Sequence, residues 1–183
     1  MNTTSGEFKS EKELLEACVK QDRRAQKALY ELYSSRMLTL CVRYTGDRER
    51  AKDIMHDAFI TVFEKIGSYS ASGSFEGWLR RIFVNTALMS LRKSDVLKYS
   101  EELSGVEKEV TIDSSVLGNL SSKDLLRLIS SMPLGFRTVF NMYAIEGYSH
   151  QEIAKEMKIS EGSSRSQLSR ARTWLQERIG SKY

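Results

Sequence analysis

Apolar residues recur at helical spacing along almost the whole chain, in which glycine is sparse and proline occurs once. In the first half the pattern predicts four helices, over about residues 10–20, 23–44, 48–66 and 75–92. The third has the clearest repeat, an i, i+3, i+4 progression that places its apolar side chains on one face. These side chains belong to Ala51, Ile54, Met55, Ala58, Phe59, Val62, Phe63 and Ile66. The polar loop Gly67–Ser74 precedes the fourth helix, and its last serine is expected to cap that helix.

The second half of the chain predicts four shorter helices. The first starts near residue 121 and ends before Pro133, a residue that suits the first turn of the next helix, Leu134 to Ile145. Ser149-His150-Gln151-Glu152 is a capping box that opens a short helix to Met157. After a three-residue break, a serine at position 160 caps the last helix, which runs to about Ile179.

Between the two halves, residues 95–120 lack sustained periodicity and are rich in Glu, Ser and Gly, which predicts an extended linker. The sequence therefore predicts an all-α protein with two small helical domains, residues 1–94 and 121–183. Lysine and arginine outnumber aspartate and glutamate by 16 to 12 in the first domain and by 10 to 6 in the second, whereas the linker has 2 against 6. Two basic blocks around an acidic segment favour two modules that bind a polyanion.

Other functional classes lack their usual sequence signals. Residues 1–10 have no apolar core of a signal peptide, and no apolar run approaches about 18 residues, so we expect a cytoplasmic protein. Cys18 and Cys41 lie in apolar helical stretches, and neither they nor His56 and His150 have metal-ligand spacing. We expect no enzyme activity, no metal or other cofactor and no small-molecule substrate, because no nucleophile–base pair or glycine-rich phosphate loop appears.

Residues 151–172 have the pattern of a helix-turn-helix. The small Ala154 permits the close helix crossing that this motif requires. The second helix of the pair carries a glutamine and three arginines among serines, at Gln167, Arg165, Arg170 and Arg172. Short polar side chains let a helix enter the major groove of DNA, where arginine and glutamine reach base edges and phosphates. A solvated helix without a partner is the alternative interpretation, which the capped turn and the basic second helix together disfavour.

The same stretch resembles the promoter-recognition helix of bacterial sigma factors. Ser160-Glu161-Gly162-Ser163-Ser164-Arg165-Ser166-Gln167-Leu168-Ser169-Arg170-Ala171-Arg172 follows the family pattern, and Met132-Pro133-Leu134 and Gly147–Ala154 match the segment before it. Ser164 and Gln167 depart from the pattern, which usually has an apolar and a basic residue at these positions. The resemblance implies that the −35 promoter element is contacted by Ser149, Ser163, Arg165, Ser166, Gln167, Ser169, Arg170 and Arg172.

Asp53, His56 and Asp57 form one polar patch on the third predicted helix, because they stand at i, i+3 and i+4. A solvated face is the ordinary interpretation of such a patch. The segment Asp53–Phe59 is, however, similar to the region 2 helix of sigma factors, an Asp-apolar-apolar-Gln-acid pattern that docks on the clamp coiled coil of the polymerase beta-prime subunit. His56 stands where the family commonly has Gln, and imidazole changes its charge near neutral pH. Docking is therefore expected to be mildly pH-sensitive.

The fourth predicted helix carries the motif Phe75-x-x-Trp78-Leu79-x-Arg81-Ile82-x-x-Asn85. Its apolar members share a face and are expected in the core, whereas its arginines and asparagine lie off that face. An arginine beside an amide can hold a phosphate and the edge of an extruded base. The motif resembles the −10-recognition helix of sigma factors, in which the preceding loop closes around a flipped base. The resemblance implies contacts to the −10 element at Tyr69, Arg80, Arg81, Asn85, Arg92 and Lys93.

The similarity extends over about residues 10–94 and 121–180, without sigma region one or a separate third domain, which is typical of the extracytoplasmic-function class. It implies a promoter-specificity subunit that binds promoter DNA, an anti-sigma factor and core RNA polymerase. Polymerase contacts are expected at the beta-prime clamp coiled coil and, through helices around Leu128–Tyr143, at the beta flap. The acidic linker is expected to lie in a basic channel of the polymerase.

Two other functions stay open. A stand-alone helix-turn-helix transcriptional regulator would explain residues 149–172, but it leaves the Asp53–Asp57 patch and the Trp78–Asn85 group without a role. A helical adaptor that binds only protein would leave both basic blocks as solvated faces. Transcription with purified core polymerase separates the three, because only a sigma factor gives core enzyme its start sites.

Overall fold

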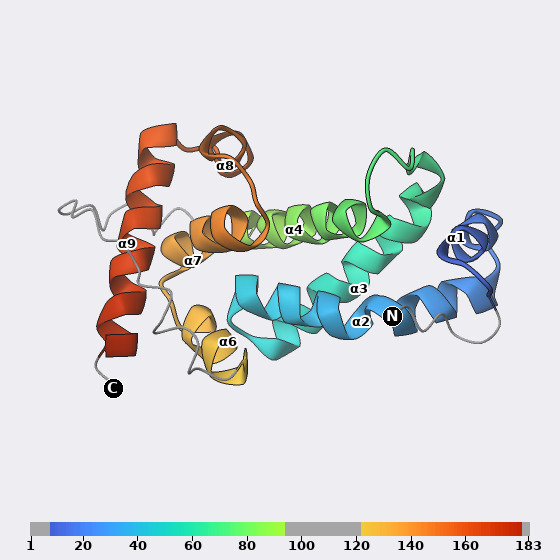
Figure 1. The fold of residues 1–183 in the computed structure, drawn as a ribbon, viewed down its shortest axis with the longest axis horizontal. Helices are drawn as coiled ribbons and strands as arrows, with labels where there is room; N and C mark the ends of the chain where they lie inside the picture. The colour runs from blue at the N-terminus through green and yellow to red at the C-terminus, as the bar shows by residue number, and fades with distance from the viewer. Residues whose placement is uncertain (1–7, 94–121, 181–183) are drawn as a thin grey trace. The chain divides into compact units, whose positions relative to one another are not determined.

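The computed structural model describes residues 8–93 and 122–180 (Figure 1). All regular elements in these two ranges are helical, with no strand among them, so the predicted all-α fold is confirmed. The predicted linker, residues 95–120, lies outside the described residues. Contacts between residues divide the chain into two units, Met1–Val42 with Arg48–Ala87, and Arg43–Asp47 with Leu88–Tyr183.

The first unit begins with α1 (Glu11–Val19) and contains α2 (Arg23–Thr45) as far as Val42. Ser10 caps α1, because its Oγ accepts a hydrogen bond from the backbone N–H three residues further on, at 3.2 Å. Asp22 caps α2, because its Oδ1 accepts from the N–H groups two and three residues further on, at 2.7 and 3.3 Å. Both helices therefore start where the sequence predicts them.

α3 (Arg48–Lys65) is followed by a single 3-10 turn, η1 (Ile66–Ser68), before α4 (Phe75–Lys93). The loop between α3 and α4 is thus shorter than predicted, residues 69–74, because the 3-10 turn takes its first two residues. Ser74 caps α4 as predicted, and its Oγ accepts a hydrogen bond from the N–H of Gly77 at 3.1 Å.

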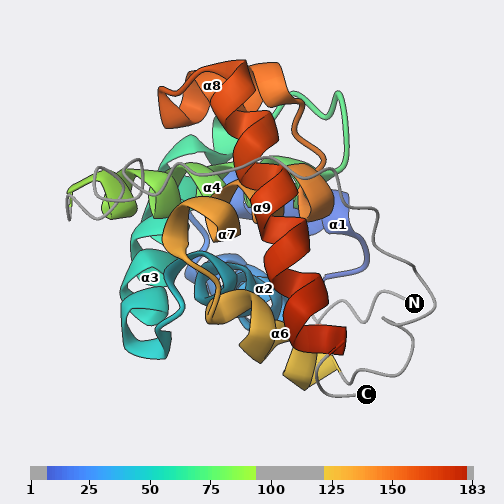
Figure 2. The same ribbon diagram turned by 90° about the vertical axis from the view of Figure 1, so that its left-hand side faces the viewer.

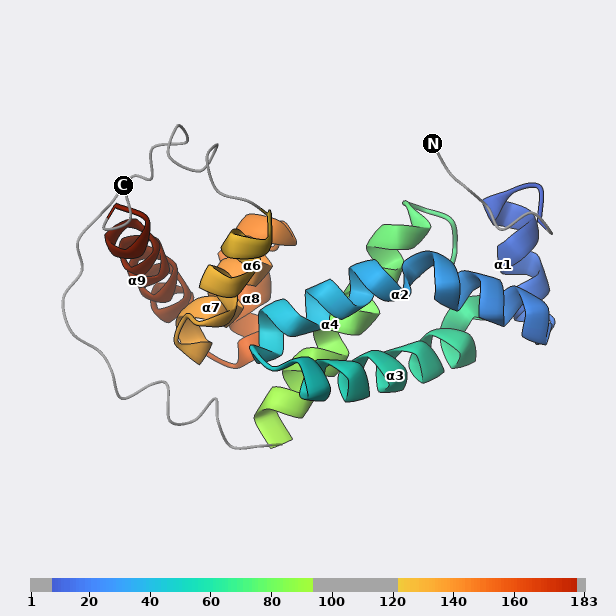
Figure 3. The same ribbon diagram turned by 90° about the horizontal axis from the view of Figure 1, so that it is seen from below.

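An aromatic contact joins three helices of the first unit. The ring centroid of Phe59 in α3 lies 4.7 Å from that of Tyr30 in α2 and 5.1 Å from that of Phe83 in α4. Figure 3 shows α2, α3 and α4 packed along one another, with α1 beside the beginning of α2. The surrounding core contains Leu14, Leu29, Met37, Leu40, Ile54, Val62, Phe75, Leu79 and Val84. Each large apolar side chain buried here stabilises the unit by about 1.5–3 kcal/mol, and this packing decides which faces of α3 and α4 meet solvent.

The helices of the second unit are α6 (Ser122–Ser130), α7 (Leu134–Phe140), α8 (His150–Met157) and α9 (Glu161–Gly180). α7 and α8 both contact α9, and Figure 2 shows α8 beside the N-terminal end of α9. The core of this unit includes a cluster of Met132, Ala171, Leu175 and Ile179, with Leu128, Phe136, Phe140 and Trp174 packed against them.

The predicted helix from Leu134 to Ile145 changes its hydrogen bonding halfway. α7 ends at Phe140, and a π turn, η3 (Asn141–Ile145), follows it, in which the N–H of Glu146 donates to the carbonyl of Asn141 at 2.9 Å. Gly147 then adopts the left-handed conformation, with φ +77°, and ends the segment. Hydrophobic periodicity does not predict this change, because the α and π repeats differ too little over five residues.

Candidate nucleic-acid interface

α8 and α9 form a helix-turn-helix with both helix starts capped. The capping box predicted at Ser149 is present: its Oγ accepts from the N–H of Glu152 at 3.2 Å, and its own N–H donates to the Glu152 carboxylate at 2.9 Å. Lys158 ends α8 in the left-handed conformation, with φ +57°. Ser160 then caps α9, because its Oγ accepts from the N–H of Ser163 at 2.9 Å. The chain thus turns between the helices within three residues.

The predicted DNA-contacting residues of α9 differ in exposure. Ser163 and Arg165 are exposed, and the half-buried ones are Ser166, Ser169, Arg170 and Arg172. Gln167 is only 8% exposed, and its Oε1 has no hydrogen-bond partner in the part of the chain that the structure describes. Gln167 therefore lies on the inner side of α9, and its position does not support a contact with a base edge.

Arg165 lies in an ion pair with Glu161, one turn earlier on α9, at 2.8 Å. Both side chains are well exposed, 60% and 44%, so the pair contributes only about 0–1 kcal/mol. A phosphate or a guanine edge can therefore compete for the guanidinium at little cost.

Ser164, which departs from the sigma-factor pattern, is fully buried and 0% exposed. Its Oγ lies 2.9 Å from Nδ1 of His150, the first residue of α8. The hydroxyl therefore has a partner, so the serine avoids the cost of an unsatisfied buried polar group. The sequence contains both residues, but nothing in it indicates that they meet.

The Asp53, His56 and Asp57 side chains are all exposed on one face of α3, as predicted. The structure adds Ile60 to this face, an apolar side chain that is 58% exposed. Ile60 stands four residues after His56 and off the apolar stripe of α3. This spacing indicates that it belongs to the exposed face, a signal that the sequence prediction missed. His56 Nε2 also lies 3.4 Å from the hydroxyl of Tyr30 on α2.

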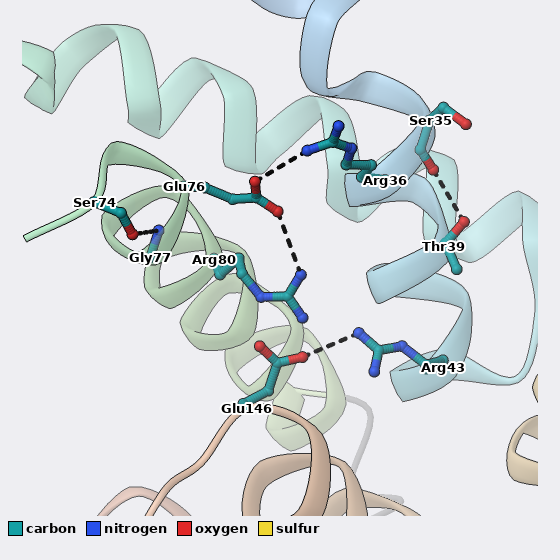
Figure 4. A network of polar contacts seen from close by, with 9 residues as sticks. All are labelled: Ser35, Arg36, Thr39, Arg43, Ser74, Glu76, Gly77, Arg80 and Glu146. Carbon is teal, nitrogen blue, oxygen red and sulfur yellow. Dashed lines mark hydrogen bonds and ion pairs between the residues drawn. The ribbon is translucent and has the colours of Figure 1, made fainter. Parts of the chain in front are cut away.

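Arg81 and Asn85 are exposed and lie one turn apart on α4, as predicted. Arg80 is turned elsewhere, because its guanidinium lies 3.9 Å from the Glu76 carboxylate, which also accepts a hydrogen bond from Arg36 of α2 at 3.0 Å (Figure 4). Sequence spacing indicates the contact between Arg80 and Glu76, one turn apart, but not the contribution of α2. Further along α4, Arg92 is half-buried and Lys93 is exposed.

Tyr69, predicted to contact the −10 element, is half-buried by other aromatic rings. Its ring centroid lies 5.4 Å from that of Phe75 and 5.7 Å from that of Trp78. Its hydroxyl donates to the carbonyl of Gly73 and so ties the two ends of the loop together. The contacts of Tyr69 thus hold the loop against the start of α4.

Neither a membrane-spanning helix nor a metal site is present in the described ranges, residues 8–93 and 122–180. No helix there is long and apolar enough to cross a membrane. No group of three or more His, Cys, Asp or Glu side chains there is arranged to hold a metal ion.

Comparison with protein-family models gives two matches, each to a region of the same family. The model for sigma-70 region 2 matches residues 29–96, and the model for sigma-70 region 4 matches residues 122–175, so together they cover more than half of the chain. The chain belongs to the sigma-70 family. The region 2 match includes α2, from Leu29, together with α3 and α4, and the region 4 match includes α6 to α8 and most of α9.

Relatives of this sigma factor include members of the extracytoplasmic-function (ECF) group. The RNA polymerase sigma-H factor of Pseudomonas aeruginosa is 27% identical over 173 residues, which cover 88% of this chain and 90% of the relative. The ECF RNA polymerase sigma-E factor of Escherichia coli K12 is 27% identical over 177 residues, which cover 91% and 92%. The sequence is thus that of an ECF sigma factor.

A solved structure has the same fold as this sigma factor. It is the sigma factor RpoE of Bartonella quintana, in a co-crystal with the anti-sigma factor NepR, with a TM-score of 0.53 and 20% sequence identity. The similarity covers 86% of this chain and 98% of that one. As a sigma factor, the protein directs the initiation of transcription by core RNA polymerase at promoter DNA.

Proposed function

We propose that this ECF sigma factor holds core polymerase through α3 and recognises two elements of one promoter, the −10 element through α4 and the −35 element through α9. The observation that carries the proposal is that each sigma-70 match contains its own exposed polar face: Arg81 and Asn85 in the region 2 match, Ser163 and Arg165 in the region 4 match. Such faces suit phosphate and base contacts.

For the −35 element, α9 enters the major groove with its first two turns. Short serine side chains let the helix approach closely, and the exposed Arg165 reaches base edges or phosphate. The N-terminal end of α8, at Ser149, places the positive end of the helix dipole beside a phosphate. The remaining contacts are Ser163, Ser166, Ser169, Arg170 and Arg172; Gln167 is left out because it is 8% exposed.

For the −10 element, Arg81 and Asn85 capture an unpaired base of the opening strand. Extruding a base costs a few kcal/mol, and contacts to its phosphate and its edge offset that cost. Tyr69 acts by holding the loop at residues 69–74 in shape, because its ring packs on Phe75 and Trp78. Arg80, Arg92 and Lys93 contribute positive charge near the DNA backbone.

For polymerase, the exposed face of α3 docks on the beta-prime clamp coiled coil. Asp53 and Asp57 supply charge, His56 supplies a hydrogen bond, and the exposed Ile60 supplies apolar area at the centre of the contact. Helices around Leu128–Tyr143 hold the beta flap. The protein acts in the cytoplasm without catalysis of its own.

The chain is organised as a region 2 domain, residues 1–94, a linker, 95–120, and a region 4 domain, 121–183. An anti-sigma factor controls it, by analogy with the Bartonella quintana sigma factor, which is bound to the anti-sigma factor NepR in its co-crystal. Both parts of this proposal rest on family similarity.

The deciding experiment is transcription from a promoter library with purified core polymerase. We expect the protein to give core enzyme a defined set of start sites, and Arg165→Ala to lower their use while Lys27→Ala, an exposed charge on α2, leaves it unchanged. A stand-alone regulator would act only on complete holoenzyme, and an adaptor would bind no DNA. Either of these results would overturn the proposal.

A further inference from the structure

A histidine and a buried serine join the first turns of α8 and α9. Nδ1 of His150 lies 2.9 Å from Oγ of Ser164, and Ser164 is fully buried. The two residues are 14 positions apart, and a helix end and a turn lie between them. The hydrogen bond therefore connects two elements and does not belong to either helix alone.

The imidazole of His150 is held on a second side by an aromatic ring. Tyr143, in η3, stacks on it with ring centroids 4.5 Å apart and an interplanar angle of 21°. Stacking fixes the plane of the imidazole, and the capping box at the preceding Ser149 fixes its backbone. The ring of His150, at the start of α8, thus contacts both η3 and α9 in a defined orientation.

The buried position of Ser164 determines where its neighbours on α9 point. Successive residues of an α-helix are about 100° apart around the axis, because the helix has 3.6 residues per turn. With Ser164 fixed inward, Ser163 and Arg165 are turned outward on either side, and both are exposed. A small rotation of α9 about its axis would displace both side chains in the same direction around the helix. Base recognition by hydrogen bonds tolerates little such displacement.

We propose that His150 is a positioning residue for promoter recognition: through Ser164 it sets the rotation of α9 at which Ser163 and Arg165 meet the −35 element. This inference rests on the proposed role of α9. It assigns to His150 no contact with DNA, and it explains why a serine can stand at a position where the sigma-factor pattern has an apolar residue.

The test uses two substitutions of His150 that distinguish the contribution of its stacked ring from that of its Nδ1 hydrogen bond. His150→Asn places an amide near the position of Nδ1 and removes the ring, whereas His150→Phe keeps a ring on Tyr143 and removes the hydrogen bond. Full-length variants are reconstituted with core polymerase, and their affinity is measured for a promoter found by start-site mapping and for the same DNA with a scrambled −35 element.

We expect His150→Phe and Ser164→Ala each to lower the preference for the intact −35 element by about three- to tenfold, the range of one net hydrogen bond. The double variant should lose no more than either single one, because both remove the same interaction. His150→Asn should retain most of the preference. Affinity for the scrambled DNA should stay within about twofold of the parent throughout.

The outcomes separate the two proposals. If the parent shows no preference for the intact −35 element, the proposed role of α9 fails. If the parent shows it but His150→Phe and Ser164→Ala keep it, or if their losses add in the double variant, the positioning role is wrong. The positioning role would also be wrong if His150→Asn and His150→Phe lost equal preference for the intact −35 element. The same holds if the loss of preference followed a loss of helical content measured by circular dichroism, because His150 would then be a purely structural residue.

Discussion

The hydrogen-bond partner of Ser164 is visible in the structure but not in the sequence. The departure of Ser164 from the sigma-factor pattern is visible in the sequence, and so is the cost of burying its hydroxyl without a partner. The partner, His150, is not visible, because contacts between residues 14 positions apart in different helices leave no periodic signal. Exposure is more predictable: Asp53, His56 and Asp57 lie off the apolar stripe of α3 and are exposed.

At Gln167, the burial in the structure differs from the exposure that the predicted DNA contact requires. The family pattern puts a DNA-contacting residue at this position, and a polar side chain on a basic helix favours the same assignment. In the structure it is 8% exposed and packs inward. Local sequence cannot indicate how far α7 and α8 cover one side of α9, because that depends on tertiary packing.

The half-buried His150 makes stability depend on pH. Burial lowers the pKa of the His150 imidazole below its ordinary value of 6.5, with Arg165 and Arg172 acting in the same direction and Glu161 against it. The unfolded chain therefore takes up the proton more readily than the folded protein. The contribution of neutral His150 to folding stability is complete above about pH 6.5 and is lost as the pH falls through the lowered pKa. The groups that face the ring or act on its charge are Tyr143 from η3 and Glu161, Arg165 and Arg172 from α9.

We expect the melting temperature of the parent to fall more steeply than that of His150→Asn between about pH 7.5 and pH 5. Thermal unfolding followed by circular dichroism at a series of pH values measures the difference. Parallel curves for the two proteins would show that His150 does not titrate differently in the folded and unfolded states.

Replacing Gln167 by methionine is expected to stabilise the protein. The buried Oε1 of Gln167 has no hydrogen-bond partner among the described residues, and methionine has nearly the same length without the polar atoms. The gain should be about 1 kcal/mol, or a few degrees in melting temperature. Promoter affinity should stay unchanged; a fall of the size expected for Arg165→Ala would instead identify Gln167 as a DNA contact.

At the scale of elements, the sequence predicts helix starts better than helix ends. The predicted serine caps at Ser74, Ser149 and Ser160 are all present, because capping is a local interaction with neighbouring N–H groups. The 3-10 turn after α3 and the π turn after α7 are not predicted, because they depend on how the surrounding helices pack.

On α3, the exposed Ile60 should contribute to polymerase binding without contributing to stability. We expect Ile60→Ala to weaken the complex with core polymerase about tenfold and to leave the melting temperature unchanged, because this side chain is 58% exposed. Val19, on α1, is a matched control, since it is also an exposed apolar side chain, at 48%. Equal effects of Ile60→Ala and Val19→Ala in a fluorescence binding assay would contradict the proposed docking face.

On α4, the Glu76 carboxylate partly neutralises Arg36 and Arg80 beside the proposed −10 face (Figure 4). We expect Glu76→Gln to raise the affinity of the reconstituted polymerase for a single-stranded −10 oligonucleotide about two- to fivefold at low salt, because both arginines become more available to phosphate. Glu64→Gln removes the same charge from an exposed position on α3. If Glu76→Gln and Glu64→Gln raised the affinity for the oligonucleotide equally, the net charge of the protein would explain the effect, and not the position of the removed carboxylate.

For the whole molecule, composition already divides the sequence into two basic blocks and an acidic segment, and the family matches fall in the two basic blocks. Charge indicates that each block binds a polyanion. It does not indicate that both bind the same DNA molecule, which is the central claim of the proposed function.

Footprinting of the reconstituted polymerase on one mapped promoter tests this claim most directly. We expect the parent to protect the −35 and −10 elements together, Arg165→Ala to lose protection at −35 first, and Asn85→Ala to keep it while failing to open the DNA at −10. If the two variants lost the same part of the footprint, or if the parent formed no complex with core polymerase, the two faces would not have separate roles.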